Sequence, residues 1–238
     1  MSRPRGGPVE GSSTSRTAGA VSAEFRERLV SAGVVAIVRT ADADAVEAAV
    51  DAVLAGGIRA VEITFTVPGA LGVIRALARS LPRDVLLGAG TVLDADTATR
   101  AAAAGARFIV SPVLRPEVTA AARAGGAAAV PGAFTPTEIL AAWDGGAGAV
   151  KLFPASALTP GFIREMKGPL PQIPLVPTGG LTPESAAAWI AAGAAAVGLG
   201  SSLLDPVAIA AGRFGELTER ARRLVSAVDG ARAGRPTR

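Results

Sequence analysis

The sequence predicts an α/β fold: a closed (β/α)8 (TIM) barrel with one extra helix at its N-terminal end. Eight apolar segments of strand length alternate with segments of helical periodicity, and no hairpin turn joins one strand to the next; this alternation is typical of a parallel sheet. A length of 238 residues suits one such barrel. The competing fold, an open doubly wound sheet, would carry a glycine loop after its first strand. Here the glycine pairs instead follow the last two strands, which favours the barrel.

Each predicted strand is a short apolar run, and a buried parallel strand requires such a run. In chain order the strands are expected at Val34–Arg39, Ala60–Phe65, Val85–Thr91, Phe108–Pro112, Ala128–Pro131, Gly148–Ala155, Leu175–Gly180 and Ala196–Ser201.

The predicted helices carry start and stop signals. A leading amphipathic helix is expected over Ser22–Ala32, with Phe25, Leu29 and Val30 on one side. Several later helices open with a proline at the first helical position, and one of them also has threonine as N-cap and glutamate at N3. The helices after the strands are expected over Asp42–Leu54, Gly69–Arg79, Asp94–Ala104, Pro116–Ala124, from Thr135, over Thr159–Met166, from Thr182, and from Asp205 to near Val228.

The composition limits the chemistry that the chain can perform. Half of the residues are hydrophobic, which is enough for a substantial core, and the chain contains no cysteine, histidine or tyrosine. Disulfides and thiolate metal sites are therefore excluded, and both the commonest catalytic zinc ligand and the commonest general base are missing. No cluster of acidic residues suggests a magnesium site. Any acid–base chemistry must therefore rest on Asp, Glu, Lys, a hydroxyl group, water or the substrate.

The net charge of +4 resides in the ends of the chain. Without residues 1–22 and 229–238, the chain has 18 basic and 18 acidic residues. No basic stripe with interleaved aromatics is present, so we expect no nucleic-acid partner. We expect residues 1–21 to be a disordered extension, 22–228 the barrel and 229–238 a basic disordered tail. No signal peptide or membrane-spanning run is apparent, which predicts a soluble, cytoplasmic protein.

Lys151 interrupts an otherwise apolar strand. The chain has only two lysines, Lys151 and Lys167, against 22 arginines. Unlike arginine, lysine can lose its proton and act as a nucleophilic amine. Lys151 therefore suggests a Schiff base with a carbonyl substrate. The alternative is a lysine at a strand end with its ammonium group in water.

Glu62 is the one carboxylate within the predicted strand cores. In a barrel the active site lies at the C-terminal ends of the strands, so inward-facing Glu62 and Lys151 would share a site. A purely structural buried ion pair is the alternative, although such a pair is a weak source of stability. Thr64 follows Glu62 on the same strand face.

The remaining strand ends supply groups that suit an acidic, phosphorylated ligand. Arg39 is either a charge at the rim or a clamp for a carboxylate, which its planar guanidinium suits. Thr91 either donates a hydrogen bond to the same carboxylate or only fills a strand end. Pro112 and Phe153 are expected as pocket walls, with Phe153 beside the amine. The glycine-containing turns Gly179-Gly180 and Gly200-Ser201 suit a phosphate site, because glycine lets backbone N–H groups approach an anion. Tight turns are the alternative explanation for these glycines.

Taken together, the strand-end motifs resemble those of the class I 2-keto-3-deoxy-6-phosphogluconate (KDPG) aldolases, a family that includes 4-hydroxy-2-oxoglutarate aldolases. The resemblance extends over residues 24–225. The motifs are Val61–Pro68, Gly88–Val92, Ile109–Pro112, Val130–Gly132, Lys151–Pro154 and Pro177–Gly180. Members of the family are cofactor-free (β/α)8 barrels and usually homotrimers.

The resemblance implies a role for each residue. Lys151 would form the Schiff base and Glu62 would be the general acid/base. The pyruvate pocket would be lined by Thr91, Pro112 and Phe153, and the phosphate would be held by Gly179, Gly180, Gly200 and Ser201.

The chain departs from the pattern at Thr66, where some members have a substrate-binding arginine, and we expect Arg39 to take that role. The segment Ser156–Pro160 is similar to that of 6-phosphogalactonate aldolases, so both sugar epimers remain open as substrates. A phosphate-binding barrel epimerase or synthase without imine chemistry is the alternative function, and a non-catalytic assembly protein is another.

Overall fold

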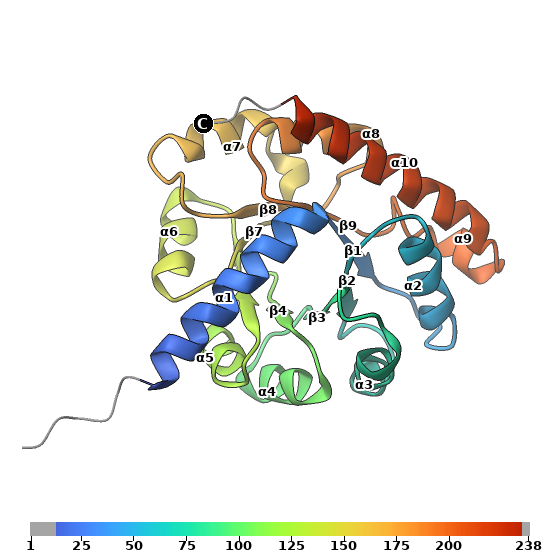
Figure 1. Ribbon diagram of the computed structural model, residues 1–238, viewed down its shortest axis with the longest axis horizontal. Helices are drawn as coiled ribbons and strands as arrows, with labels where there is room; N and C mark the ends of the chain where they lie inside the picture. The colour runs from blue at the N-terminus through green and yellow to red at the C-terminus, as the bar shows by residue number, and fades with distance from the viewer. Residues whose placement is uncertain (1–12, 235–238) are drawn as a thin grey trace, which may run out of the picture.

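The computed structural model describes residues 13–234, in which parallel strands form a central barrel inside a ring of helices (Figure 1). One sheet has the strand order β5-β4-β3-β2-β1-β9 and the other has the order β6-β7-β8. The strands are β1 (Val34–Val38), β2 (Ala60–Thr64), β3 (Leu86–Gly90), β4 (Phe108–Val110), β5 (Ala128–Val130), β6 (Gly132–Ala133), β7 (Val150–Leu152), β8 (Leu175–Pro177) and β9 (Val197–Leu199).

The two sheets join at both edges to close the barrel. Strands β5 and β6 are separated only by Pro131, which lacks an N–H group and so breaks the strand ladder. The carbonyl of Pro131 nevertheless accepts a hydrogen bond from the N–H of Lys151 at 2.9 Å. At the other edge, a parallel bridge pairs Thr178 with Gly198. The prediction of a closed barrel is thus confirmed, with β5 and β6 together in place of the fifth predicted strand.

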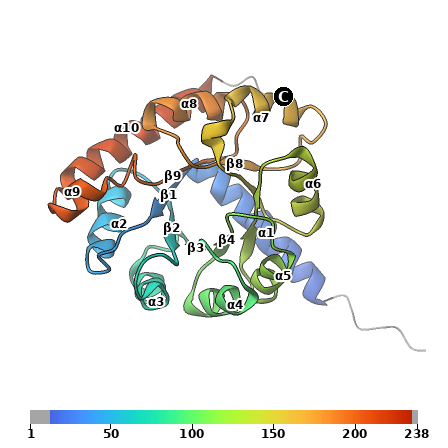
Figure 2. The ribbon, with the colours of Figure 1, turned by 180° about the vertical axis from the view of Figure 1, so that it is seen from behind.

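The helices lie outside the strands, as predicted from their periodicity (Figure 2). Thr135 and Thr182 form capping boxes at the starts of α6 and α8, each followed by a proline. The helices are α1 (Ser13–Ala32), α2 (Ala45–Ala55), α3 (Ala70–Ser80), α4 (Ala95–Ala104), α5 (Pro116–Ala124), α6 (Pro136–Asp144), α7 (Pro160–Lys167), α8 (Pro183–Ala191), α9 (Pro206–Ala210) and α10 (Phe214–Ala233), with a short 3-10 turn η1 at Ala155–Ala157.

Helix α1 crosses the N-terminal end of the barrel (Figure 1). Its Phe25 and Leu29 are buried against the barrel interior, as predicted, whereas Val30 lies outside this buried face and is exposed. The helix starts at Ser13 rather than Ser22. Residues 13–21, expected to be part of a disordered extension, are therefore helical; the segment contains two alanines and no proline to stop a helix.

The C-terminal helix α10 continues to Ala233, beyond the end near Val228 that we expected. Arg232 donates hydrogen bonds to the carbonyls of Val30 and Ser31 at the end of α1, so the last turn is fixed to the leading helix. Part of the segment expected to be a disordered tail is therefore helical. Residues 1–12 and 235–238 lie outside the described residues.

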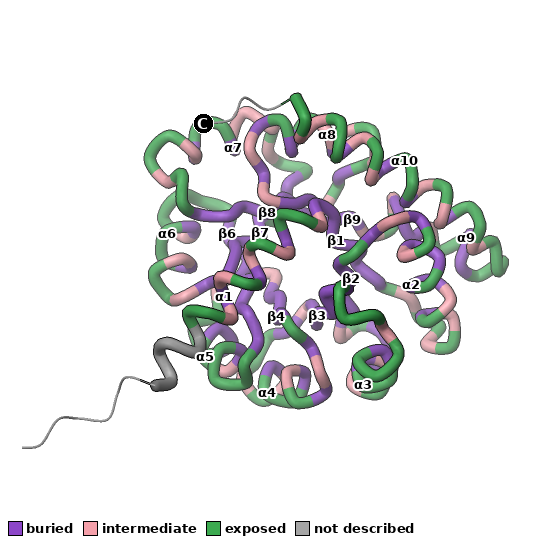
Figure 3. Tube along the Cα trace, in the orientation of Figure 1, coloured by how far each residue is buried: buried purple, intermediate pink, exposed green. Residues whose placement is uncertain are grey.

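The core has two layers. Figure 3 shows buried strands inside a more exposed ring of helices. The larger layer packs the outer strand faces against the helices, and the smaller one fills the barrel around Phe108 and is closed off by Phe25 and Leu29. Within residues 13–234, no helix combines the length and apolar character that a membrane crossing needs.

Candidate active site

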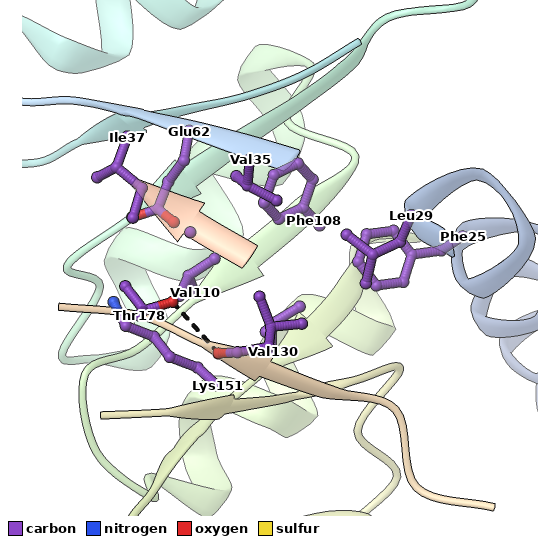
Figure 4. A pocket seen from close by; sticks show the side chains of 12 residues that line it. Phe25, Leu29, Val35, Ile37, Glu62, Phe108, Val110, Val130, Lys151 and Thr178 are labelled. Atoms are coloured by element: carbon purple, nitrogen blue, oxygen red, sulfur yellow. Dashed lines mark hydrogen bonds between the residues drawn. The ribbon is translucent and has the colours of Figure 1, made fainter. Parts of the chain in front are cut away.

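Glu62 and Lys151 meet inside the barrel, as predicted. Glu62 is in β2 and Lys151 is in β7, and their side chains are only 3% and 7% exposed. Both line one narrow cavity that is otherwise mostly apolar. In Figure 4, Glu62 lies on one side of this cavity, Lys151 and Thr178 lie on the other, and Phe25 and Leu29 of α1 close the far end.

The Glu62 carboxylate is buried without a hydrogen-bond partner for its Oε1 oxygen. Burial raises the pKa of this carboxyl, and the positive charges of Lys151 and Arg39 oppose that shift without cancelling it. Among the described residues, no ion pair within 4.0 Å links Glu62 to Lys151. The two groups are therefore close enough to interact through their charges yet separated by a gap. A buried, unpartnered carboxylate with a raised pKa suits a general acid/base.

Phe153 lies beside the Lys151 amine, as predicted. The Nζ atom is 4.9 Å from the centre of the phenyl ring. Phe153 is 37% exposed whereas Lys151 is 7% exposed, so the aromatic residue lies on the solvent side of the amine. Lys151 is therefore a buried lysine beside an aromatic ring, and not a strand-end lysine with its ammonium group in water.

Arg39 and Thr91 lie together at the rim of the barrel. The Arg39 guanidinium donates a long hydrogen bond of 3.4 Å to the Thr91 hydroxyl oxygen. Thr91 has a positive φ of 60°, which non-glycine residues rarely adopt and which often marks a functional site. Because the Thr91 oxygen accepts this bond, its proton remains available for a ligand. A guanidinium and a hydroxyl donor together suit a carboxylate.

Thr64 and Thr66 form a hydrogen-bonded pair above Glu62. The buried Thr64 hydroxyl donates to the carbonyl of Val38 at 3.1 Å. Its oxygen lies 2.7 Å from that of Thr66, and since a hydroxyl has one proton, Thr66 must be the donor in this contact. Thr64 is therefore held by strand β1, and Thr66 faces the exposed rim. The half-buried Pro112 follows β4 on the same rim.

The two predicted phosphate-binding turns lie side by side. Gly179 and Gly180 follow β8 with φ angles of 92° and 74°, which glycine adopts freely. Gly200 and Ser201 follow β9. The hydroxyl of the next residue, Ser202, donates to the carbonyl of Leu181 at 2.7 Å, so the turns are tied together. Two glycine-containing turns beside the start of helix α8 are suited to holding an anion.

Two residues at the site were missing from the predicted set. The buried Thr178 lines the cavity with Glu62 and Lys151, and its hydroxyl donates to the carbonyl of Val176 at 3.2 Å. Ser156 lies against Gly180, whose missing side chain would be 2.5 Å from the serine Cβ. The two-residue strand period could have placed Thr178 on the inner face. Ser156 entered the sequence analysis only as the first residue of the segment Ser156–Pro160, and its contact with the glycine turn depends on the chain bend after β7.

Comparison with known proteins places the chain among aldolases. Residues 25–219 match the family described as KDPG and KHG aldolase. The 2-dehydro-3-deoxy-6-phosphogalactonate aldolase of Escherichia coli is 37% identical over 170 residues, which is 71% of this chain and 83% of the relative. The 2-dehydro-3-deoxy-phosphogluconate aldolase of Treponema pallidum is 35% identical over 168 residues, 70% of this chain and 80% of the relative.

Solved structures agree with these matches. A structure described as native KDPGal superimposes with a TM-score of 0.77 at 36% identity, covering 83% of this chain and 95% of the other. The KDPG aldolase of Legionella pneumophila, solved with pyruvate as a covalent carbinolamine, gives a TM-score of 0.76 at 26% identity over 84% of this chain and 97% of the other. The chain therefore belongs to the KDPG and KHG aldolase family.

Proposed function

We propose that this protein is a class I aldolase that cleaves 2-dehydro-3-deoxy-6-phosphogluconate to pyruvate and glyceraldehyde 3-phosphate. One observation carries the proposal: a buried lysine, Lys151, faces a buried carboxylate, Glu62, across a gap without an ion pair. A structural pair would close that gap to recover its desolvation cost. The pyruvate carbinolamine described for the Legionella relative supports the same chemistry.

In the proposed mechanism, the neutral Lys151 amine attacks the C2 ketone of the substrate. Loss of water gives a protonated imine, which accepts the electron pair released when the C3–C4 bond breaks. Glu62 takes the proton from the C4 hydroxyl, directly or through a water molecule, and glyceraldehyde 3-phosphate leaves. The resulting enamine is protonated at C3, and hydrolysis of the imine frees pyruvate and restores the amine.

The other site residues would hold the two ends of the substrate. We assign the carboxylate to Arg39 and Thr91, which already contact each other. Thr64, Pro112 and Phe153 would form the pocket around the pyruvate part. The phosphate would be bound by the backbone N–H groups of Gly179, Gly180 and Gly200 with the hydroxyl of Ser201.

Two points of substrate choice remain: which sugar epimer is cleaved, and whether 4-hydroxy-2-oxoglutarate is cleaved as well. Relatives named for galactonate and gluconate substrates match this chain at 37% and 35% identity, so overall similarity does not separate the epimers. We propose the gluconate-derived substrate first, with cleavage of 4-hydroxy-2-oxoglutarate to pyruvate and glyoxylate as a second activity. The galactonate-derived substrate is the alternative. Side-by-side cleavage assays with the three substrates decide the order.

We further propose a cytoplasmic homotrimer. Three large apolar side chains, Leu93, Val113 and Phe134, are between 38% and 49% exposed. They follow β3, β4 and β6. Strand β3 pairs with β4, β4 pairs with β5, and β6 continues β5, so the three side chains share one side of the C-terminal rim. Exposed apolar side chains grouped in this way are typical of an interface. Light scattering with size-exclusion chromatography tests the trimer, and a monomer at micromolar concentration would reject it.

The decisive test of the aldolase proposal is chemical trapping. Borohydride added with pyruvate should reduce the imine and leave a stable adduct on Lys151, detected by mass spectrometry of the digested protein. Lys151→Ala should abolish the adduct. A phosphate-binding epimerase or synthase would give no adduct, and an adduct that survives Lys151→Ala would place the imine elsewhere.

A further inference from the structure

Two glycines on the inner face of strand β3 leave space that side chains of the neighbouring strands occupy. Gly88 and Gly90 alternate along this strand, so both face the barrel interior. A Cβ atom built on Gly90 would lie 1.8 Å from Oε1 of Glu62, 2.4 Å from its Cδ and 2.6 Å from its Cγ. The carboxyl group of Glu62 thus occupies the space that any side chain at Gly90 would fill.

Gly88 accommodates a different neighbour in the same way. A Cβ atom there would lie 2.3 Å from the ring of Phe108 in strand β4. Gly88 pairs with Glu62 in the ladder, and Thr64 pairs with Gly90, so the Glu62 side chain leans one step toward the C-terminal end of the barrel. The first glycine makes room for a core aromatic, and the second makes room for the candidate general base.

Shape, not hydrogen bonding, fixes the Glu62 carboxylate. Its Oε1 has no hydrogen-bond partner and no ion pair within 4.0 Å in the described part of the chain. Lys151 projects from β7, on the other side of the cavity (Figure 4). A carboxylate expelled from the space over Gly90 would have to move toward the cavity, which means toward the amine.

We propose that Gly90 is a positioning residue, whose missing side chain holds the Glu62 carboxylate against strand β3 and away from Lys151. This inference rests on the aldolase function proposed above. Keeping the carboxylate aside leaves the amine free to attack a ketone, and leaves space between the two groups for the C3–C4 bond of the substrate. The backbone of Gly90 is ordinary strand, so an alanine there would meet a steric conflict without backbone strain.

The test is a double-mutant cycle between Gly90→Ala and Glu62→Asp. A displacement of about 1 Å in a catalytic group typically costs ~100-fold in rate, so we expect Gly90→Ala to lower kcat by roughly that factor in the natural background. Aspartate is one methylene shorter and retreats from the added methyl group. In the Glu62→Asp background, Gly90→Ala should therefore cost less than ~10-fold, because residues in contact are not additive.

The pH dependence of pyruvate trapping provides a second measurement. Gly90→Ala should still form the borohydride-trapped adduct, but with a shifted pH profile, because the displaced carboxylate lies nearer to the charge of Lys151, which lowers the pKa of Glu62. Gly88→Ala is the matched control, since it disturbs the same strand through Phe108 and should leave this pH dependence unchanged. Gly72→Ala, whose added Cβ meets nothing within 4 Å, should resemble the natural enzyme throughout.

If the natural enzyme traps pyruvate and cleaves the substrate, the proposed aldolase function is supported whatever the result for Gly90. Given that result, an unchanged kcat in Gly90→Ala, or an equal loss in the natural and Glu62→Asp backgrounds, would overturn the positioning role alone. A natural enzyme that traps no pyruvate would overturn the proposed function, and the role of Gly90 with it.

Discussion

The burial of Glu62 and Lys151 predicts that removing both charges makes the protein more stable and inactive. The perturbation is the double replacement Glu62→Leu with Lys151→Met, which keeps similar volumes. Glu62 is 3% exposed with one unpartnered oxygen, and Lys151 is 7% exposed. A buried acceptor without a partner costs about 1–3 kcal/mol, and apolar replacement of a buried charged pair stabilises by up to about 4 kcal/mol. We therefore expect a gain of roughly 1–4 kcal/mol in the free energy of unfolding.

For a chain of this length, each kcal/mol moves Tm by about 2–4 °C, so a gain of several degrees should be measurable by calorimetry or circular dichroism. The single replacement Lys151→Met should instead destabilise, because it leaves the carboxylate buried without a compensating charge. A double variant clearly less stable than the natural protein would refute the reasoning and would indicate that the pair is structural.

The sign of the pH effect follows from the raised pKa of Glu62. The folded chain binds this proton more readily than the unfolded chain. The stabilisation is therefore complete below the ordinary pKa of a glutamate and is lost as pH rises through the raised pKa. Because the Lys151 charge lowers the pKa of Glu62, Lys151→Met should lose more stability than the natural protein between about pH 5 and pH 8. Denaturant unfolding curves of the natural protein and Lys151→Met at these two pH values measure this difference. The pH-dependent loss should disappear in the double variant Glu62→Leu with Lys151→Met, which lacks the carboxyl group.

Other replacements separate the remaining roles. Glu62→Gln should lower kcat by about 10²–10⁴-fold yet still allow trapping of pyruvate; unchanged kcat would remove Glu62 from the chemistry. Arg39→Ala should raise KM for all substrates, as an exposed clamp for their shared carboxylate would require, and steady-state kinetics with equal KM values would contradict that assignment. Gly180→Ala, with a φ of 74° and Ser156 in its way, should raise KM for the phosphorylated substrate much more than for 4-hydroxy-2-oxoglutarate; equal effects would place the phosphate elsewhere. Thr135→Ala should lower the unfolding free energy by ~1 kcal/mol without changing kcat, since it removes a helix cap; a lower kcat would show that this cap affects the site.

The parts of the fold that follow from local periodicity were predictable. Alternation of side chains along a strand places Glu62 and Lys151 on inner faces once the barrel is assumed, and the structure confirms that placement. The split of the fifth strand at Pro131 was missed, although proline is a known ladder breaker, because the strand remains continuous in space. The start of α1 at Ser13 was missed because residues 13–21, mostly serine, threonine, alanine and glycine, show no apolar periodicity.

Packing relations were not predictable from the sequence. The pattern Gly88-Ala89-Gly90 was recognised as a motif, but only the three-dimensional structure relates its second glycine to the Glu62 carboxylate. The proximity of Arg39 to Thr91 likewise depends on where two rim side chains point, and strand periodicity does not specify rotamers at strand ends.

The helix across the N-terminal end of the barrel has a kinetic consequence. Phe25 and Leu29 close the N-terminal end of the barrel, so that only its C-terminal end is open. Lys151 is buried inside, and the glycine turns after β8 and β9 lie at the open end. In the proposed cleavage, the ketone must enter first and the phosphate last. The aldehyde product then lies between the enamine and solvent, so it must depart before pyruvate does. Product inhibition should therefore follow an ordered pattern, with pyruvate the second product released.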